Sequence, residues 1–445
     1  MSAADSWFIV VVGYAILLAW PVSTLTLVSF AVRYVAAHGR TAPKTMQDGT
    51  PEHFWIIVPA LNEDVVVGNT VAAALTLGGP GGTLARVIVV DDGSDDRTPE
   101  VLAGIDHPRL HVIRRELPDA RKGKGEALNA AYRAILAQTA AEGIDADRVV
   151  VGIIDGDGQG SRNILLEVSR MLRDPGVGAV QVQVRIRNRD KLLGAVQDLE
   201  FGAIVNACQL LRDVLDTVGL GGNGQFTRLS ALQTLGGDPW SGCLVEDLEL
   251  GLRIHLEGVG IRYTSRASVT QQAVVNVRRL ARQRTRWAQG NLQCARYLRR
   301  LVTSRQISKT SLFEVLHYLL SPWLNALVTV LLAGMVAVAV VGLVSGHPVP
   351  YLHSWHDLAH SGEVWFAVTF FPGFVWSLVH RRRLHDETLF RLLTAAVAYP
   401  AFLLLGLVAT YRAIVRQARG QQSWAKTERL MEEPLQHPLD VALAA

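Results

Sequence analysis

Four long stretches without a charged residue limit what this 445-residue chain can fold into. They cover residues 6–32, 315–356, 364–380 and 392–411. Between Arg33 and Glu314 the chain has the mixed polar and apolar composition of a water-soluble domain. A run of about 20 apolar residues is enough for a helix to cross a bilayer. The pattern excludes a purely soluble protein and a disordered chain, and it predicts a soluble domain held between membrane segments.

The first apolar stretch predicts an N-terminal transmembrane anchor over residues 1–36. Asp5 precedes this stretch, whereas Arg33, Arg40 and Lys44 follow it. Because cationic residues stay on the cytoplasmic side, we expect the central domain to lie in the cytoplasm. A cleaved signal peptide would show the reverse charge order, so an uncleaved anchor in the plasma membrane is predicted.

The other apolar stretches predict a C-terminal transmembrane region over residues 323–413, followed by a basic tail over 414–445. The candidate spans are Leu324–Val344, Val364–Val379 and Leu392–Thr410. Simple crossings place the C-terminus outside, yet basic residues follow the last stretch, which is typical of the inside. Either the last segment is re-entrant near Pro400, or Ser311–Leu320 adds a passage through the membrane.

Residues 276–322 predict basic amphipathic helices at the membrane surface. Within them, residues 278–310 contain ten basic residues and no acidic one. The anionic lipids of the inner leaflet attract such a helix, although a solvated helix face is the simpler alternative. No groove-reading motif accompanies the charge, so nucleic acid is not expected as a partner.

The central block, residues 50–275, alternates short apolar runs with stretches of helical length. Phe54–Pro59, Val87–Val90 and Val149–Ile154 are typical of buried strands bounded by polar turns. This alternation predicts an α/β domain with a mainly parallel sheet. In such sheets ligands bind beyond the carboxyl ends of the strands.

Polar clusters follow each of these three strands. They are Ala60-Leu61-Asn62-Glu63, the acidic run Asp91–Asp96, and Asp155-Gly156-Asp157-Gly158. Carboxylates at strand ends suit Mg²⁺ or Mn²⁺ shared with a substrate phosphate. Asp-Asp-Gly-Ser is also a common turn, so a purely structural role is the alternative. The Lys-Gly-Lys-Gly run that includes Lys124 lacks the order of a nucleotide-hydrolase phosphate loop.

Two further motifs lie on predicted helices. Glu246 and Asp247 open one helix, where carboxylates can also simply complement the helix dipole. Gln283, Arg286 and Trp287 are three or four residues apart and share one side of a second helix. A cation beside an aromatic ring suits a pyrophosphate next to a sugar, although Trp287 is equally typical of the membrane interface.

The order of these motifs over residues 54–290 resembles the membrane-bound family-2 glycosyltransferases, which include cellulose, hyaluronan and poly-N-acetylglucosamine synthases. The resemblance implies a cytoplasmic α/β domain of the GT-A type, the nucleotide-diphospho-sugar transferase fold, joined to transmembrane helices. It also implies an inverting single displacement with a UDP-sugar donor and a divalent ion. The chain is therefore expected to be an enzyme, a hexosyltransferase.

The resemblance also assigns roles residue by residue. Asp247 would be the catalytic base on the acceptor hydroxyl, and Asp157 would hold the Mg²⁺ or Mn²⁺. The nucleotide-sugar donor would contact Ala60, Glu63, Asp91, Lys124, Asp155, Gln283 and Arg286. The acceptor would contact Glu246, Trp287 and Gly222, the last from the glycine-rich run that begins at Gly219.

The resemblance leaves the acceptor open. Gln-x-x-Arg-Trp is associated with polymer synthases, so transfer to a growing β-linked polysaccharide of the cell envelope is the first expectation. The small number of membrane segments weakens the likeness to cellulose synthase, and any export partner is unidentified. The Gly-Gly-Asn-Gly and Arg-Trp-Ala-Gln-Gly-Asn runs also resemble glycosyl-diacylglycerol synthases, which makes a glycolipid synthase the alternative. An inactive scaffold or sugar-nucleotide sensor is disfavoured because every expected carboxylate is present. Trp424-Ala425-Lys426-Thr427 resembles a W-x-K-T stretch of smaller family members, with no role assigned.

Overall fold

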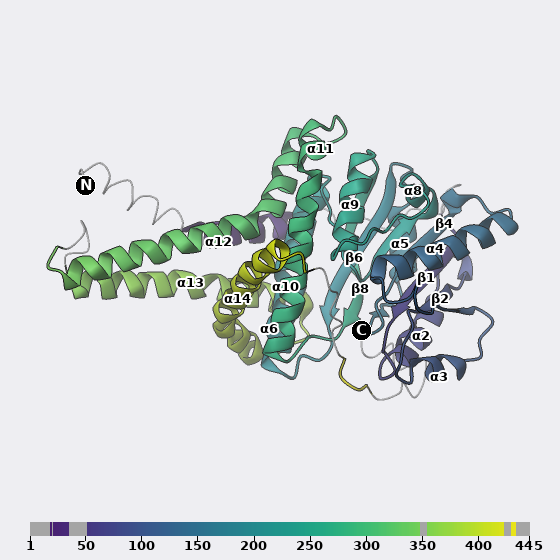
Figure 1. Ribbon diagram of the computed structural model, residues 1–445, viewed down its shortest axis with the longest axis horizontal. Coiled ribbons are helices and arrows are strands. Elements are labelled where there is room, and N and C mark those ends of the chain that lie inside the picture. Colours follow the sequence, from purple (N-terminus) through teal and green to yellow (C-terminus); the bar gives the residue numbers. More distant parts are fainter. Residues whose placement is uncertain (1–17, 20, 35–50, 348–353, 422–428, 433–445) are drawn as a thin grey trace.

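An eight-stranded mixed sheet forms the centre of the soluble part in the computed structural model (Figure 1). The structure describes residues 18–19, 21–34, 51–347, 354–421 and 429–432. The strands are β1 His53–Ala60, β2 Arg86–Asp91, β3 Leu110–Arg114, β4 Val149–Ile153, β5 Gln159–Gly160, β6 Val177–Ile186, β7 Gln225–Arg228 and β8 Gly260–Gln271. Their order across the sheet is β3-β2-β1-β4-β7-β6-β8-β5.

The predicted strands are confirmed, and the parallel arrangement holds for β3-β2-β1-β4 and again for the pair β6-β8. β3, β2, β1 and β4 are parallel neighbours, with Ile57 opposite Ile88 and Ile153. β7 then runs antiparallel between β4 and β6. The prediction of a mainly parallel sheet missed β7, because the four residues of this strand are too few to show a pattern.

Alternate residues of β1 face opposite sides of the sheet, and helices cover both sides. Trp55 and Ile57 pack with α4 on one face, whereas Ile56 and Val58 pack with α2 and α5 on the other. The helices of the soluble part are α2 Val67–Leu75, α3 Thr98–Ala103, α4 Lys124–Ala141, α5 Ile164–Met171, α6 Leu192–Leu199, α7 Asn206–Val214, α8 Leu229–Gln233, α9 Glu246–Leu256, α10 Val277–Gln293 and α11 Leu298–Thr303. Shorter turns are η1 Pro80–Gly82, η2 Ala146–Arg148, the π-helix η3 Glu200–Val205 and η4 Cys294–Tyr297.

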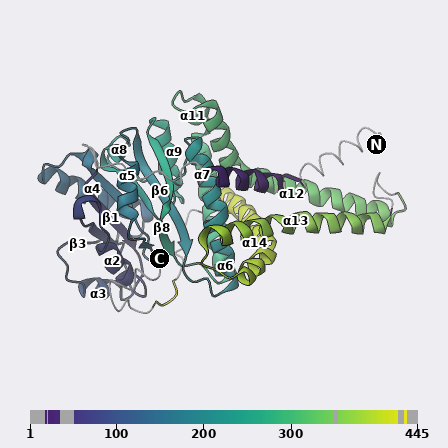
Figure 2. The same cartoon turned by 180° about the vertical axis from the view of Figure 1, so that it is seen from behind.

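Three C-terminal helices are long and apolar enough to cross a membrane: α12 Lys309–Val344, α13 Trp355–Leu384 and α14 Leu389–Ala418. Figures 1 and 2 show α12 and α13 side by side, as an arm that extends away from the soluble domain. Each of the three predicted C-terminal spans lies inside one of these helices. Of the predicted N-terminal anchor, residues 21–34 are helical, whereas residues 1–17, 20 and 35–36 lie outside the described part.

The helices support neither of the two explanations offered for the last apolar segment. α14 continues through Pro400 without a break, so the chain does not reverse there. Ser311–Leu320 is the first part of α12, a helix of 36 residues. At about 1.5 Å per residue this helix is far longer than the roughly 30 Å hydrocarbon core of a bilayer. Its first turns contact the soluble domain, because Ser311 donates to the Leu215 carbonyl and Glu314 accepts from Arg212.

Polar contacts fasten the long C-terminal helices to the soluble part of the chain. His380 of α13 lies 2.9 Å from Asp198 of α6, and Arg185 of β6 bonds the same carboxylate. Along α14, Arg416 donates to Gln289 of α10. The first contacts tie α13 to α6 and β6, and the last ties α14 to α10.

Candidate active site

A cavity of about 490 Å³ opens at the carboxyl ends of β1 and β4, between α9 and α10. Such a volume is typical of small-molecule sites. Ten of the predicted site residues line it: Ala60, Glu63, Lys124, Asp155, Gly222, Glu246, Asp247, Gln283, Arg286 and Trp287. The structure therefore brings together motifs that are separated by more than 200 residues in the sequence.

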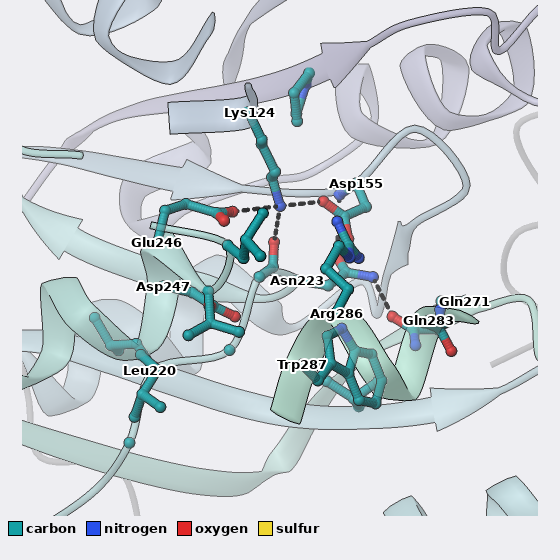
Figure 3. A pocket seen from close by; sticks show the side chains of 18 of the residues that line it. Lys124, Asp155, Leu220, Asn223, Glu246, Asp247, Gln271, Gln283, Arg286 and Trp287 are labelled. Carbon is teal, nitrogen blue, oxygen red and sulfur yellow. Dashed lines mark hydrogen bonds and ion pairs between the residues drawn. The ribbon is translucent and has the colours of Figure 1, made fainter. Parts of the chain in front are cut away.

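Lys124 joins the two carboxylate groups of the cavity. Its Nζ lies 2.6 Å from Asp155 Oδ1 and 3.5 Å from Glu246 Oε1, and it donates to the Gly222 carbonyl at 2.9 Å. Figure 3 shows the ammonium group between Asp155 and Glu246. Burial alone would lower the pKa of Lys124, but Asp155 and Glu246 outweigh burial and raise the pKa. Lys124 therefore stays charged and holds the two ends of the site together.

Glycines make this junction possible. Lys124 begins α4 because Gly123 takes a φ of +116°, which a side chain would disfavour. A Cβ on Gly222 would lie 3.1 Å from Lys124 Nζ and 3.3 Å from Asp247 Oδ2. Gly222 thus leaves room between the lysine and the predicted base.

Glu246 and Asp247 occupy the first turn of α9 and face Lys124. Burial raises the pKa of Glu246 to about 7, with a smaller contribution from the charge of Asp247 and against the opposing charge of Lys124. Burial likewise raises the pKa of Asp247. A carboxylate whose pKa approaches neutrality is a more effective proton acceptor than an exposed one.

The α10 side chains form the wall opposite Lys124. Arg284 forms an ion pair with Glu200 at 2.5 Å, and its guanidinium lies 4.6 Å from the Trp287 ring. This contact fixes the orientation of the indole. Trp287 and Gln283 lie on the cavity side of the helix, which supports a site role over an interfacial one (Figure 3).

Asp91 and Asp157 are the two predicted site residues that do not line the cavity. Asp91 is buried and its carboxylate is engaged by Arg114 at 2.7 Å and by the Ser94 amide at 2.9 Å. Its neighbour Asp92 lines the cavity instead. Asp157 is covered by Arg429, which lies 3.0 Å from Asp157 Oδ1.

Arg429 belongs to a short segment, residues 429–432, that lies over the Asp157 end of the site. Its guanidinium also lies 3.7 Å from Glu63, and Gln272 donates to Glu432 at 2.7 Å. The sequence interpretation missed Arg429 because the W-x-K-T run that ends two residues before it was given no role. The nearby W-x-K-T run was the signal that pointed to this part of the chain.

The residues around Asp157 fit a divalent cation. Oδ1 of Asp157 is buried and faces the charge of Arg429, so this oxygen already occupies a cation-binding position. Across the described ranges, no cluster of three or more Asp, Glu, His or Cys side chains is arranged to hold a metal. An ion bound by Asp157 and Asp155 would thus need water and substrate oxygens as further ligands, which is the usual mode for Mg²⁺.

Sequence comparison identifies the family. The profile described as "Glycosyltransferase like family 2" matches residues 51–290, more than half of the chain. The chain belongs to the family-2 glycosyltransferases. The match covers the whole sheet and most of α10, so this glycosyltransferase carries its predicted site motifs inside the family domain.

Curated relatives of this glycosyltransferase include two kinds of synthase. A β-monoglucosyldiacylglycerol synthase of Trichormus variabilis is 33% identical over 279 residues, which are 62% of this chain and 56% of the relative. A poly-β-1,6-N-acetyl-D-glucosamine synthase of Staphylococcus epidermidis is 29% identical over 245 residues, 53% of each chain. The glycosyltransferase thus spans about half the length of the curated relatives it matches.

The fold also has a solved counterpart. The mannosyltransferase PcManGT from Pyrobaculum calidifontis, solved in complex with GDP-Man and Mn²⁺, aligns with a TM-score of 0.55 at 20% identity. The alignment covers 86% of this chain and 98% of PcManGT. The predicted GT-A fold of the glycosyltransferase is confirmed.

The raised pKa of the Glu246–Asp247 pair gives the glycosyltransferase a specific pH dependence. The base works only when ionised and burial raises the pKa of Asp247, so we expect kcat/KM for the acceptor to fall with acidification at a higher pH than an exposed aspartate would give. Glu246→Gln removes a neighbouring negative charge and should move this acidic limb to lower pH. A kcat/KM profile over pH 5–9, measured for both proteins, checks the shift. An identical limb in the variant would contradict the coupling.

Arg429 should compete with a divalent ion for Asp157 when no donor is bound. Without this competitor the carboxylate is available more often, so Arg429→Ala should bind Mn²⁺ about tenfold more tightly. Electron paramagnetic resonance of free Mn²⁺ measures the affinity without turnover. Arg419→Ala, at the exposed end of α14, is the matched control. Equal Mn²⁺ affinities in Arg429→Ala and wild type would show that Arg429 does not compete with the ion for Asp157.

Proposed function

We propose that this family-2 glycosyltransferase transfers a sugar from a UDP-sugar to a hydroxyl of a growing β-linked polysaccharide of the cell envelope. The observation that carries the proposal is the contact of Lys124 with both Asp155 and Glu246 in one cavity. Asp155 follows β4, where donors bind in sheets of this type, whereas Glu246 and Asp247 belong to α9. A donor and an acceptor held on the two sides of Lys124 would meet beside Asp247.

Asp247 acts as general base in this proposal. An alcohol is a weak nucleophile, so a positioned carboxylate must accept its proton as the new bond to the anomeric carbon forms. The hydroxyl attacks from the face opposite the leaving diphosphate, which inverts the anomeric centre in a single step. Trp287 lies across the cavity and would support the face of the acceptor sugar.

The donor end carries the charges that a leaving nucleoside diphosphate needs. Lys124 and Arg286 line this part of the cavity, and both would bind the diphosphate oxygens. Asp157 and Asp155 would hold Mg²⁺ or Mn²⁺, which when bound stabilises the negative charge of the leaving group. Glu63 and Ala60 would frame the nucleotide, with Asp91 behind them.

The membrane helices determine where in the cell the reaction takes place. With positive residues inside, the soluble domain lies at the cytoplasmic face of the plasma membrane, where nucleotide sugars are available. The exposed arginines of α10 and α11 would meet the anionic inner leaflet. We retain residues 50–275 as the catalytic domain, residues 276–322 as the membrane-surface region and residues 323–413 as the transmembrane region.

A glycolipid synthase is the second candidate. It is favoured by the relative at 33% identity, which is named a β-monoglucosyldiacylglycerol synthase. In that case the acceptor hydroxyl would belong to a lipid, and Asp247 would activate it in the same way.

Product analysis separates the candidates. The purified full-length protein is incubated with radiolabelled UDP-glucose or UDP-N-acetylglucosamine, membrane lipids and Mn²⁺. We expect a high-mass, lipase-resistant product. A chloroform-soluble product would instead establish the glycolipid synthase, and an absence of donor consumption with every UDP-sugar would mark an inactive scaffold or sensor.

A further inference from the structure

The cavity extends to a second polar patch that none of the motifs above includes. Arg212 of α7 and Tyr318 of α12 both line it. Tyr318 packs against the same small cluster as Val245 and Leu248, the residues on either side of Glu246 and Asp247. The patch therefore lies on the acceptor side of the predicted base, away from Asp157.

The patch is rigid and carries no net charge. Arg212 Nε donates to Glu314 Oε1 at 2.7 Å, and the guanidinium lies 4.0 Å from the Tyr318 ring centroid. The side chains of Arg212 and Glu314 are 14% and 12% exposed, so solvent screens their ion pair only weakly. Because Glu314 neutralises Arg212, an anionic ligand such as a lipid phosphate gains little here.

The patch nevertheless presents hydrogen-bond donors. In the part of the chain that the structure describes, neither terminal nitrogen of Arg212 nor the Tyr318 hydroxyl has a hydrogen-bond partner. Val205 and Leu248 supply apolar wall beside these donors. A neutral ligand with many hydroxyls and apolar C–H faces matches this combination, and a sugar ring has both features.

We propose that Arg212 and Tyr318 form a second acceptor subsite, which binds the sugar next to the one whose hydroxyl attacks the donor. The inference rests on the proposed function, because it requires the acceptor to be a glycan. It predicts that the enzyme prefers an acceptor of two sugars over a single sugar. Arg212 and Tyr318 would act on binding and selectivity, whereas proton transfer stays with Asp247.

Acceptor kinetics test the subsite on the full-length protein in detergent. The acceptors are β-linked disaccharides of glucose and of N-acetylglucosamine, compared with the corresponding methyl monosaccharides. Tyr318→Phe removes one hydroxyl and keeps the ring beside Arg212. It should lower kcat/KM for the disaccharide about fivefold, as expected for one hydrogen bond, and leave the monosaccharide unchanged. Phe313→Ala, an exposed position on the same helix, is the control and should change neither.

A binding measurement makes the test independent of turnover. Cys208 lines the cavity, whereas Cys243 and Cys294 are buried in the apolar cluster that also contains Leu248 of α9. Methanethiosulfonate labelling of Cys208, followed by mass spectrometry, should be slowed by a disaccharide in wild type. Tyr318→Phe should need about five times more disaccharide for the same protection.

The outcomes distinguish this inference from the proposed function. Protection of Cys208 by a disaccharide without consumption of any UDP-sugar would retain the subsite and overturn the proposed function. Donor consumption with no protection by either disaccharide would overturn the subsite and leave sugar transfer intact. Equal losses for both acceptor lengths in Tyr318→Phe would also overturn the subsite.

Discussion

Asp247→Asn should reduce sugar transfer by about 10²–10⁴-fold while leaving donor binding nearly unchanged. The asparagine keeps the shape of the side chain but cannot accept the proton of the attacking hydroxyl. Lys124 keeps its contacts with Asp155 and the Gly222 carbonyl, so the donor side remains assembled. Transfer is measured as radiolabelled product, and donor affinity by calorimetry with UDP.

The control lies on the same helix. Glu257→Gln replaces an exposed carboxylate at the other end of α9 and should retain wild-type activity. A folded Asp247→Asn protein that transfers sugar at more than a small fraction of the wild-type rate would remove Asp247 from the mechanism. Glu246 would then be the remaining acid on α9 that faces Lys124.

Removal of divalent ions should stop turnover. In the proposed mechanism Lys124 and Arg286 would neutralise the charge of the leaving diphosphate only in part, so the loss of a divalent ion should cost at least about 100-fold in kcat. EDTA treatment followed by re-addition of Mg²⁺ or Mn²⁺ measures the effect. Asp157→Ala should produce the same loss and should also abolish Mn²⁺ binding.

Readdition of the ion is the internal control, because activity must return to the treated wild type but not to Asp157→Ala. Full activity in a metal-free preparation would exclude the ion from the reaction. Restored activity of Asp157→Ala with Mn²⁺ at wild-type affinity would place the ion elsewhere in the cavity.

The sequence predicted the strands and most of the site because their signals are local. The buried runs around Ile57, Val89 and Val151 are continuous, and polar residues end each of them. Parallel β1, β2 and β4 must place their carboxyl ends at one edge, so the convergence of Asp155 with Ala60 and Glu63 followed from topology. Lys124 and Asp247 joined them through the family resemblance rather than through any local pattern.

Other features depend on tertiary contacts that leave no local pattern. Arg429 reaches Asp157 from a position 272 residues further along the chain, and no period or spacing links the two. Arg212 and Glu314 are 102 residues apart, and they meet only because α12 begins inside the soluble domain. Local sequence patterns likewise do not predict the antiparallel direction of β7, because that direction depends on where the chain re-enters the sheet.

The anomeric configuration of the product tests the account most directly. A UDP-sugar of the α configuration is turned over by the purified protein, and proton NMR of the isolated product reports the new linkage. Single displacement with Asp247 as the base predicts a β linkage throughout. An α-linked product would mean that the anomeric configuration is retained, which would contradict the back-side displacement proposed for this cavity.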